Sequence, residues 1–362
     1  MLRFNYLYLK EWGIVFIVLM FAFLLVFSSR YWRLHQKPAI HIPEETVIYF
    51  DSSVGMDELV DQLIVNGIEF DREELVWAAG VLKWQRFHRG RYEFAGSKTY
   101  PEFLSKLALG LQDPLPLLVP AGVTKEMLKV RIADQMHFEA EDLASAMQDS
   151  SFLNRHGLEE HLVYGRILPD TYEVYWTTTP EQLLDRLMSE FNERVTRAYD
   201  DRLEELGRSV DEITTLASII EWEARYDIEK PLISGLYWNR LNQRWRLQAD
   251  PTVNYAKGER NRLIYADYNI DHPYNTYRIY GLPPGPITNP SFSSLQAALF
   301  PEEHNYMYMV ATPDGVHDFS RTYAEHLRKS REWTNWLREQ RRIRFEMEQE
   351  EETTEGAHTH GF

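Results

Sequence analysis

The feature that most limits what this chain can fold into is an uncharged apolar run from Trp12 to Ser29. A helix needs roughly 20 apolar residues to cross the hydrocarbon core of a bilayer, and this run is close to that length. A cleaved signal peptide has a shorter apolar core and a small-residue cleavage site, whereas this run passes directly into Arg30, Tyr31 and Trp32. The sequence therefore predicts one uncleaved transmembrane anchor, with a buried core helix as the less favoured alternative.

Basic residues flank both ends of the apolar run. Arg3 and Lys10 precede it, whereas Arg30, Arg33 and Lys37 follow it. Positive charges near a membrane span collect on the cytoplasmic side, and the larger number lies after the run. The charge rule alone therefore favours a cytoplasmic body.

The composition indicates folded domains held together by packing. The chain has 362 residues, of which 44% are hydrophobic and 14% aromatic, enough for two or three compact units. Its net charge of -16 argues against a nucleic-acid partner, because phosphate binding requires a basic surface. It has no cysteine, which excludes disulfides, thiol nucleophiles and cysteine-ligated metals.

A short β-rich run, a turn of small residues and an amphipathic helix recur three times between Thr46 and Met136. Units of this size cannot bury their apolar faces alone, so we expect them to pack into one or two small α/β modules. A glycan-binding platform and a structural spacer are equally compatible with the pattern. The three copies read VIYFDSSVGMDELVDQLIVNG, RYEFAGSKTYPEFLSKLALG and LLVPAGVTKEMLKVRIADQM.

Two helices are predicted in the middle of the chain. Alternating residues favour a strand over Thr171–Trp176, after which Thr179 is a good N-cap with Pro180 in the first helical turn. A second helix begins after Gly207, with Ser209 or Asp211 as its cap. This second helix contains the stretch LASIIEWEA.

Glu221 is the candidate catalytic residue on that helix. Its apolar neighbours should disfavour the charged carboxylate, so we expect Glu221 to stay protonated near neutral pH and act as an acid. At about 100° per residue, Glu221 and Glu223 lie roughly 80° to either side of the face formed by Ile213, Ala217 and Ile220. The two carboxylates therefore point apart and cannot form the facing pair of a conventional glycosidase. On the helix alone, an ordinary surface glutamate is the more common explanation.

The downstream segments supply candidate binding residues. Gln248 and Asp250 lie in RLQADPTVNY, which is predicted as a polar loop or edge strand. Asn275 and Tyr277 precede a rigid turn-rich run from Gly281 to Pro286, which is typical of a groove wall, although a purely structural role is equally common. Aromatic faces stack on sugar rings and amides bind N-acetyl groups, so an aminosugar polymer is the expected ligand.

Five motifs follow one another along the chain: LASIIEWEA, YWNRL, LQADPTVNYA, YNTYRIYGLPPGPITNP and MVATPDGVHDFSRTYAEH. In order and spacing they resemble those of the YceG-like family of endolytic murein transglycosylases. The resemblance extends from about Pro43 to Trp336, and the chain departs from the family pattern at Trp222, where lysine is common, and at Ser291 and Phe292, where glycine often follows the Asn-Pro pair. These departures concern the shape of the groove.

The resemblance implies cleavage of the β-1,4 bond between N-acetylmuramic acid and N-acetylglucosamine within peptidoglycan strands. The family's catalytic glutamate falls on Glu221, which would protonate the glycosidic oxygen and then accept the proton of the sugar's own C6 hydroxyl, leaving a 1,6-anhydro end. Gln248, Asp250, Asn275 and Tyr277 become candidates for substrate binding, with Asp250 the best placed by charge to stabilise a positive anomeric centre. No cofactor and no metal are expected.

The resemblance also implies where the protein acts. Its substrate lies outside the cytoplasm, so the body is expected on the outer or periplasmic face of the bacterial plasma membrane, against the charge rule. The expected partners are peptidoglycan strands, the membrane and peptidoglycan synthases. Two alternatives remain open: a catalytically silent membrane-anchored peptidoglycan-binding scaffold, and a muramidase that uses water.

The sequence thus predicts an α+β protein with a transmembrane helix, a small α/β module that the resemblance makes LysM-like, and a larger α+β catalytic domain. His358 and His360 in the tail make a poor metal site without other ligands. The predicted divisions are a cytoplasmic segment (1–11), the anchor (12–29), a linker (30–42), the LysM-like module (43–112), the YceG-like catalytic domain (113–340) and an acidic, disordered tail (341–362).

Overall fold

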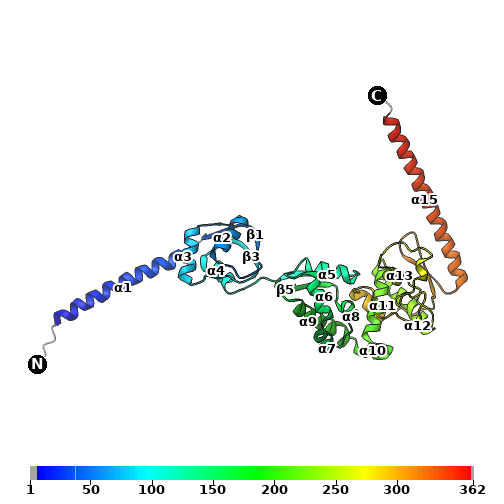
Figure 1. Cartoon of the computed structure of the whole chain (residues 1–362), viewed down its shortest axis with the longest axis horizontal. Helices are drawn as coiled ribbons and strands as arrows, with labels where there is room; N and C mark the ends of the chain where they lie inside the picture. The colour runs from blue at the N-terminus through cyan, green and yellow to red at the C-terminus, as the bar shows by residue number, and fades with distance from the viewer. Residues whose placement is uncertain (1–5, 37, 360–362) are drawn as a thin grey trace. The chain divides into compact units, whose positions relative to one another are not determined.

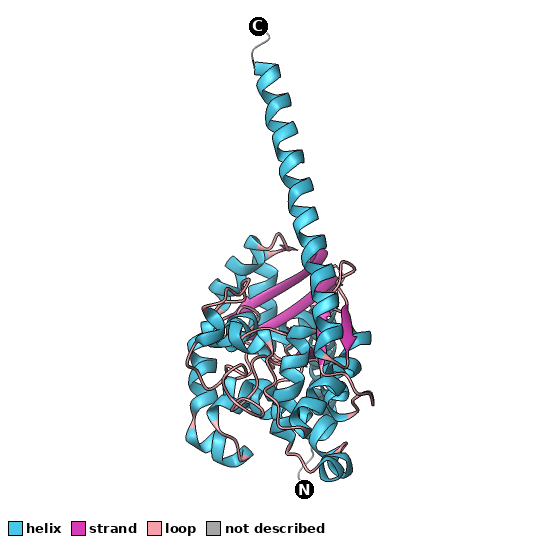
Figure 2. Ribbon diagram, turned by 90° about the vertical axis from the view of Figure 1, so that its right-hand side faces the viewer, coloured by secondary structure: helices cyan, strands magenta, loops and turns pink. Residues whose placement is uncertain are grey.

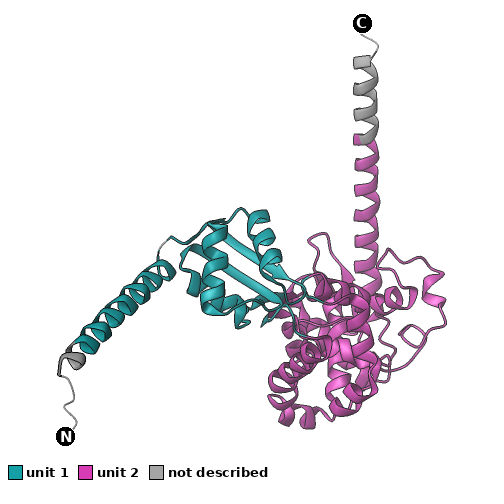
Figure 3. Ribbon diagram, turned by 60° about the vertical axis from the view of Figure 1, so that its left-hand side comes forward, with its two compact units in different colours: residues 1–117, 135–137, 173–178 teal, residues 118–134, 138–172, 179–362 magenta. Residues whose placement is uncertain are grey.

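The computed structural model describes residues 6–36 and 38–359. The order of helices and strands along the chain is shown in Figure 1, and their mixture confirms the predicted α+β class. The chain divides into two compact units, coloured separately in Figure 3. Unit 1 comprises Met1–Leu117, Gln135–His137 and Glu173–Thr178, and unit 2 comprises Leu118–Asp134, Phe138–Tyr172 and Thr179–Phe362.

The first helix has the properties of a membrane span. Helix α1 (Tyr6–Leu34) contains a 24-residue candidate span, Glu11–Leu34, in which an 18-residue window has a mean hydropathy of 2.5 and is not buried against the rest of the protein. The last residue, Leu34, packs into the core of unit 1. Large apolar side chains exposed all round a helix suit a lipid environment. The helix is longer than the predicted span, and strand β1 begins at Ile40, so the segment predicted as a linker is mostly helix end and strand start.

The rest of unit 1 is built around a three-stranded antiparallel sheet with the order β2-β1-β3. The pairing of β1 with β3 shifts between Ile42 and Thr46, where Pro43 has no N–H to donate to the ladder. Apolar side chains from the sheet and from α2, α3 and α4 form one buried core, which includes Leu59 and Phe103. The elements are β1 (Ile40–Phe50), α2 (Met56–Val65), β2 (Glu69–Phe70), α3 (Arg72–Leu82), β3 (Gly90–Lys98) and α4 (Tyr100–Ala108).

The three predicted strand-and-helix repeats form as β1–α2, β3–α4 and β4–α5. The first two share the sheet of unit 1, whereas β4 (Leu115–Val119) pairs with β5 (Asp170–Val174) in a separate two-stranded sheet. The third copy is therefore not part of the small module. The LysM-like character of that module stays a prediction.

Unit 2 is mainly helical. Its helices begin where the sequence places caps: Thr179 accepts from the backbone of Gln182 to start α9, and Ser209 accepts from the backbone of Glu212 to start α11. Its remaining elements are α5 (Lys125–Ala133), α6 (Ala140–Gln148), α7 (Ser150–His156), α8 (Glu160–Val163), η1 (Tyr164–Arg166), α9 (Pro180–Phe191), η2 (Asn192–Arg197), α10 (Asp200–Leu206), α11 (Val210–Glu223), η3 (Asp227–Glu229), α12 (Lys230–Asn242), α13 (Asp250–Lys257), η4 (Asp267–Asn269), α14 (Phe292–Leu299), β6 (Tyr308–Ala311), β7 (His317–Ser320) and α15 (Tyr323–Thr359).

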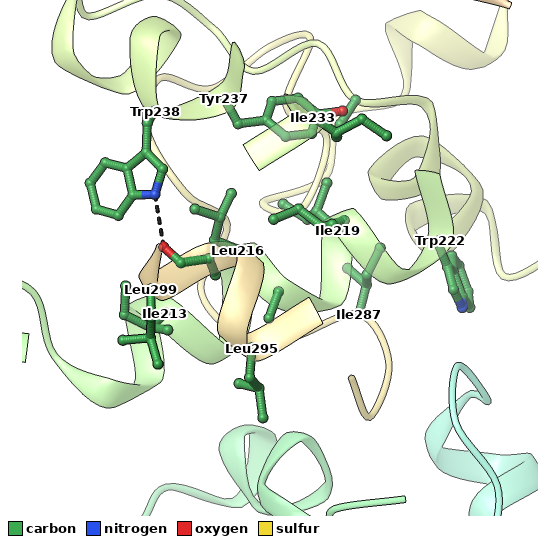
Figure 4. Packing of buried hydrophobic residues seen from close by; sticks show 14 of the residues in the cluster. Ile213, Leu216, Ile219, Trp222, Ile233, Tyr237, Trp238, Ile287, Leu295 and Leu299 are labelled. Carbon is green, nitrogen blue, oxygen red and sulfur yellow. Dashed lines mark hydrogen bonds between the residues drawn. The ribbon is translucent and has the colours of Figure 1, made fainter. Parts of the chain in front are cut away.

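Helix α11 lies at the centre of the core of unit 2. It packs against α12, α13 and α14, and Figure 4 shows its apolar side chains Leu216 and Ile219 among those of the neighbouring helices. The indole of Trp238 on α12 donates to the carbonyl of Ala298 on α14 at 2.9 Å, which ties these two neighbours together. Because α11 is held from several sides, the residues at its C-terminal end have fixed positions.

Two predicted segments differ from the structure. The segment 246–255 was expected to be a loop or edge strand, but it contains helix α13, which has Pro251 in its first turn and Gly258 at its C-cap. The tail 341–362 was expected to be disordered, but α15 continues to Thr359 and extends beyond the body of unit 2 (Figure 2). Its Glu, Arg, Gln and Met residues favour helix, and Arg342 forms i,i+3 and i,i+4 ion pairs with Glu339 and Glu346.

Candidate active site

Glu221 is held by the start of helix α14. Its Oε2 atom accepts from the backbone N of Ser291 at 3.1 Å and from the hydroxyls of Ser291 and Ser294 at 2.5 Å each. The Nζ atom of Lys230 approaches the same oxygen at 3.2 Å. Both side chains are largely buried: that of Glu221 is 13% exposed and that of Lys230 is 5% exposed. Glu221 therefore joins three elements, α11, α12 and α14, through one carboxylate oxygen.

These contacts contradict the expectation that Glu221 stays protonated. Burial acts to raise the pKa of Glu221, but the hydrogen bonds from Ser291 and Ser294 and the charge of Lys230 outweigh it and lower the pKa below its ordinary value. The prediction considered only the apolar neighbours of Glu221 along its own helix. The hydrogen-bond donors that lower the pKa come from segments that are distant in sequence. Near neutral pH, Glu221 is an ionised, paired carboxylate.

The loop that contains Pro120 and Gly122 packs against the other carboxylate oxygen of Glu221. Gly122 has a positive φ of 67°, and a Cβ atom there would lie 3.6 Å from Oε1 of Glu221. The loop is fixed because Trp222 donates to the carbonyl of Gly122 at 2.8 Å and Asn289 donates to the carbonyl of Pro120 at 2.7 Å. Glu221 is thus enclosed in a dense network of contacts.

Glu223 has the properties that were predicted for Glu221. Although the residue as a whole is partly exposed, its Oε2 atom is buried and has no hydrogen-bond partner among the described residues. Burial, reinforced by the negative charge of Asp250, raises the pKa of Glu223 to about 7. Glu223 interacts with a different set of groups from Glu221, as expected if the two carboxylates point apart.

Helix α12 provides the opposite electrostatic influence on Glu223. Arg240 and Tyr237 both act to lower the pKa of Glu223, but less than burial and Asp250 raise it. The guanidinium of Arg240 donates to the backbone carbonyls of Met307 and Leu247 and forms no ion pair with another described residue. Its charge therefore acts on Glu223 from a distance and leaves the carboxyl free to hold a proton.

Asp250 lies at the start of helix α13 and is bound by two tyrosines. The hydroxyl of Tyr277 donates to Oδ1 at 2.7 Å and that of Tyr268 to Oδ2 at 3.3 Å, with the two rings 4.6 Å apart. Both rings line a cavity of about 610 Å³ together with Arg246, Tyr265, Asn269 and Arg278. The structure thus places an exposed carboxylate, a protonatable carboxyl and an aromatic cavity in one region of unit 2.

The other two predicted binding residues have different environments. Asn275 is fully buried, donates to the carbonyls of Tyr268 and Ile270, and accepts from the backbone N of Tyr277. These bonds shape the loop that carries the tyrosines and leave no exposed surface on Asn275, whose role as a substrate ligand stays a prediction. Gln248 is exposed, with a left-handed backbone (φ 50°), and its role in binding stays a prediction.

Sequence reasoning missed several residues of this site. Lys230 was overlooked because it lies nine positions beyond Glu221, across a chain turn, and Arg240 because its charge is buried against carbonyls. Tyr268 carried a usable signal, since it belongs to the same run of tyrosines as Tyr277. Of the two tail histidines, His360 lies outside the described residues, and among those described there is no cluster of three or more His, Cys, Asp or Glu side chains suited to a metal.

The fold and the site define a class: an α+β protein with one candidate membrane span in the described part of the chain and a buried, protonatable carboxyl that interacts with a tyrosine-bound aspartate. The model of the YceG-like family matches residues 49–332. The chain belongs to this family, as its motifs predicted.

Individual relatives agree with the family match. The chain is 30% identical to the endolytic murein transglycosylase of Bacillus subtilis, in an alignment that covers 66% of this chain and 71% of that protein. It is 26% identical to the endolytic murein transglycosylase of Streptococcus pneumoniae, of which it spans only 50%. Among solved structures, a protein of Listeria monocytogenes described as YceG-like is similar, with a TM-score of 0.56 and 28% identity over 79% of this chain and 98% of that one.

Proposed function

We propose that this protein is an endolytic peptidoglycan transglycosylase, a lyase that cleaves the β-1,4 bond between N-acetylmuramic acid and N-acetylglucosamine and leaves a 1,6-anhydro end. Family membership and the names of the Bacillus and Streptococcus relatives support this reaction class. The observation that carries the proposal in this chain is the carboxyl of Glu223, whose buried Oε2 has no hydrogen bond within normal distance from a described residue and whose pKa is raised to about 7.

Glu223 is the proton donor in this proposal, in place of Glu221. A general acid must hold its proton near the working pH and must be free to release it to the substrate. Glu221 meets neither condition, because its Oε2 is bonded to two serines and a lysine that favour the ionised form. Glu221 instead holds α12 and α14 in place around the end of α11.

The reaction requires one enzymic carboxyl. Protonated Glu223 donates its proton to the glycosidic oxygen as the bond from that oxygen to C1 breaks. The C6 hydroxyl of the same muramic acid residue then attacks C1, and the carboxylate of Glu223 takes up the hydroxyl proton. The nucleophile is already part of the substrate, which gives it a high effective concentration and removes the need for an activated water.

Asp250 has two roles in this scheme. Its negative charge raises the pKa of Glu223 and so keeps the donor protonated. The same charge stabilises the positive anomeric centre that develops as the bond breaks. Tyr277 and Tyr268 fix the orientation of Asp250 through their hydroxyls, and their rings form the wall on which a sugar stacks.

Helix α1 gives the enzyme its location. A single apolar helix is compatible with one membrane crossing, and a peptidoglycan substrate requires the body on the outer or periplasmic side. Anchoring places the cut near newly made strands at the membrane, where peptidoglycan synthases are the expected partners. In the same proposal, the small module of unit 1 is a LysM-like glycan-binding element.

Mass spectrometry of the products from purified peptidoglycan tests this function. We expect fragments that end in 1,6-anhydro-N-acetylmuramic acid. Fragments heavier by one water would identify a muramidase and overturn the lyase assignment. Binding of glycan strands without any cleavage would identify a scaffold.

A further inference from the structure

Unit 2 contains a second large cavity, which the proposed reaction does not use. It has a volume of about 700 Å³ and lies between helix α15 on one side and α13 with the loop that follows it on the other. Tyr268 lines both this cavity and the tyrosine-walled cavity described above, and Asp250 lies at its edge. The remaining lining residues are Asn254, Asn261, Arg262, Leu263, Trp333, Trp336, Leu337, Gln340, Arg341 and Arg344.

One face of α15 forms a wall of this cavity. The residues that α15 contributes follow each other at intervals of three, one, three, one and three, so they share one side of the helix. The rings of Trp333 and Trp336 stack at 5.0 Å with an interplanar angle of 12°, which gives a flat apolar surface. This face changes from aromatic to basic as it approaches Arg341 and Arg344.

The basic groups of the cavity have no counter-ion among the side chains that the structure describes. Arg262, Arg341 and Arg344 form no ion pair or side-chain hydrogen bond with another described residue, whereas Arg342, on another side of α15, pairs with both Glu339 and Glu346. The carboxylate of Asp250 at the cavity's edge is already bonded to the two tyrosines. The cavity therefore presents, beside an aromatic surface, three guanidinium groups that no described side chain pairs.

We propose that this cavity binds the carboxylate-bearing peptide stem of the glycan strand being cleaved. The inference rests on the proposed function and assigns a further part of the same substrate to a further site. Guanidinium groups bind carboxylates in a two-pronged arrangement, and the tryptophan faces pack on methyl and methylene groups of the peptide. A neutral sugar chain would use the tryptophans but would leave the three arginines without partners.

The position of the cavity fits an occupant attached to the reacting sugar. Asp250, which acts on the anomeric centre in the proposed reaction, also lines the second cavity, and Tyr268 lines both cavities. A stem attached to a sugar in the first cavity can therefore enter the second. Binding energy from this remote part of the substrate would improve the capture of stem-bearing strands.

The test compares kcat/KM of the full-length chain on strands with intact stems and on strands stripped of stems by an amidase. We expect the parent protein to prefer stem-bearing strands, and the double variant Arg341→Ala/Arg344→Ala to lose roughly tenfold in kcat/KM on them, mainly through KM, as expected for the loss of charge-assisted bonds. Its rate on stripped strands should be unchanged, which also shows that the variant is folded.

The matched control is Arg331→Ala/Arg338→Ala, which removes the same charge from α15 at positions that do not line the cavity. This control should keep the preference. An equal loss on both substrates, no loss on either, or an absence of preference in the parent protein would overturn the proposal. No cleavage of either substrate by the parent protein would refute the proposed function and this inference with it.

Discussion

Glu221 and Glu223 stand two positions apart on α11, yet their pKa values shift in opposite directions. The pKa of Glu221 is lowered by two serines and a lysine, whereas that of Glu223 is raised by burial and by Asp250. The two glutamates occupy similar positions in an apolar helix. The difference between their pKa values therefore comes from the groups that other segments of the chain place beside each of them. The carboxylate of Glu221 links α11 to α12 and α14, and the carboxyl of Glu223 can hold a proton.

The charge of Asp250 leads to a prediction about pH. Because the donor must be protonated, the rate should fall as the pH rises through the pKa of Glu223, about 7. Asp250→Asn removes a negative charge that raises this pKa, so the pKa falls and the decline in rate should begin at a lower pH. The pH dependence of kcat/KM for anhydro-product release measures this shift.

Asp271→Asn is the control for that experiment. The side chain of Asp271 is 96% exposed and pairs only loosely with Arg278, at 3.7 Å. The Asp271→Asn variant should show its decline in rate at the same pH as the parent protein. A decline at the same pH in Asp250→Asn as in the parent would show that Asp250 does not set the proton affinity of the donor.

Helix α12 is the element that limits how the site can change. It carries Lys230 at its start and Arg240 near its end, and these residues act on Glu221 and Glu223 respectively. Gly235 lies between them, and a Cβ atom there would come within 2.2 Å of the backbone carbonyl of Glu302. The helix can approach this loop so closely only because residue 235 has no side chain.

We predict that Gly235→Ala lowers the free energy of unfolding of unit 2 by about 1–3 kcal/mol, because the helix and a backbone carbonyl must separate. The adjacent change Ser234→Ala is the control. The Oγ atom of Ser234 is buried without a hydrogen-bond partner among the described residues, so its loss should be neutral or slightly stabilising. Urea unfolding followed by tryptophan fluorescence compares the two, and equal midpoints would contradict the packing argument.

Elements with local signals were predictable from the sequence, and the contacts of the site were not. The apolar run, the caps Thr179 and Ser209 and the repeated strand-helix pattern are local features, and the structure agrees with each. Helix α13 was missed because its polar residues suggested a loop, although Pro251 in the first turn was a helix-start signal.

The protonation state of Glu221 could not be predicted for a similar reason. Whether Glu221 is protonated depends on Ser291 and Ser294, 70 and 73 positions away in the sequence. Asn275 looked like a ligand because amides bind sugars, but its bonds to Tyr268 and Ile270 form only when the loop folds. Hydrogen-bond partners of this kind cannot be counted from a single helix.

At the scale of the whole molecule, the proposal requires the body to lie outside the cytoplasm. The basic residues after the apolar run favour the opposite orientation by the charge rule. We predict that a reporter fused to the C-terminus, active only outside the cytoplasm, gives a signal in cells. A reporter active only in the cytoplasm should be silent in the same position, and the reverse pair of results would refute the proposed function.

The central claim is that Glu223, and not Glu221, donates the proton. The most direct test is the rate of 1,6-anhydro product release by Glu223→Gln and by Glu221→Gln, each measured where thermal unfolding shows the protein to be folded. Glu223→Gln should reduce release at least about a hundredfold without loss of stability, because the amide cannot supply the proton.

Glu221→Gln should lower the free energy of unfolding by about 2–4 kcal/mol, because the buried ammonium of Lys230 loses one of its two charged partners and keeps Asp227 and the hydroxyls of Ser291 and Ser293. The folded variant should still release anhydro products. Undiminished release by Glu223→Gln, together with a folded but inactive Glu221→Gln, would contradict the account.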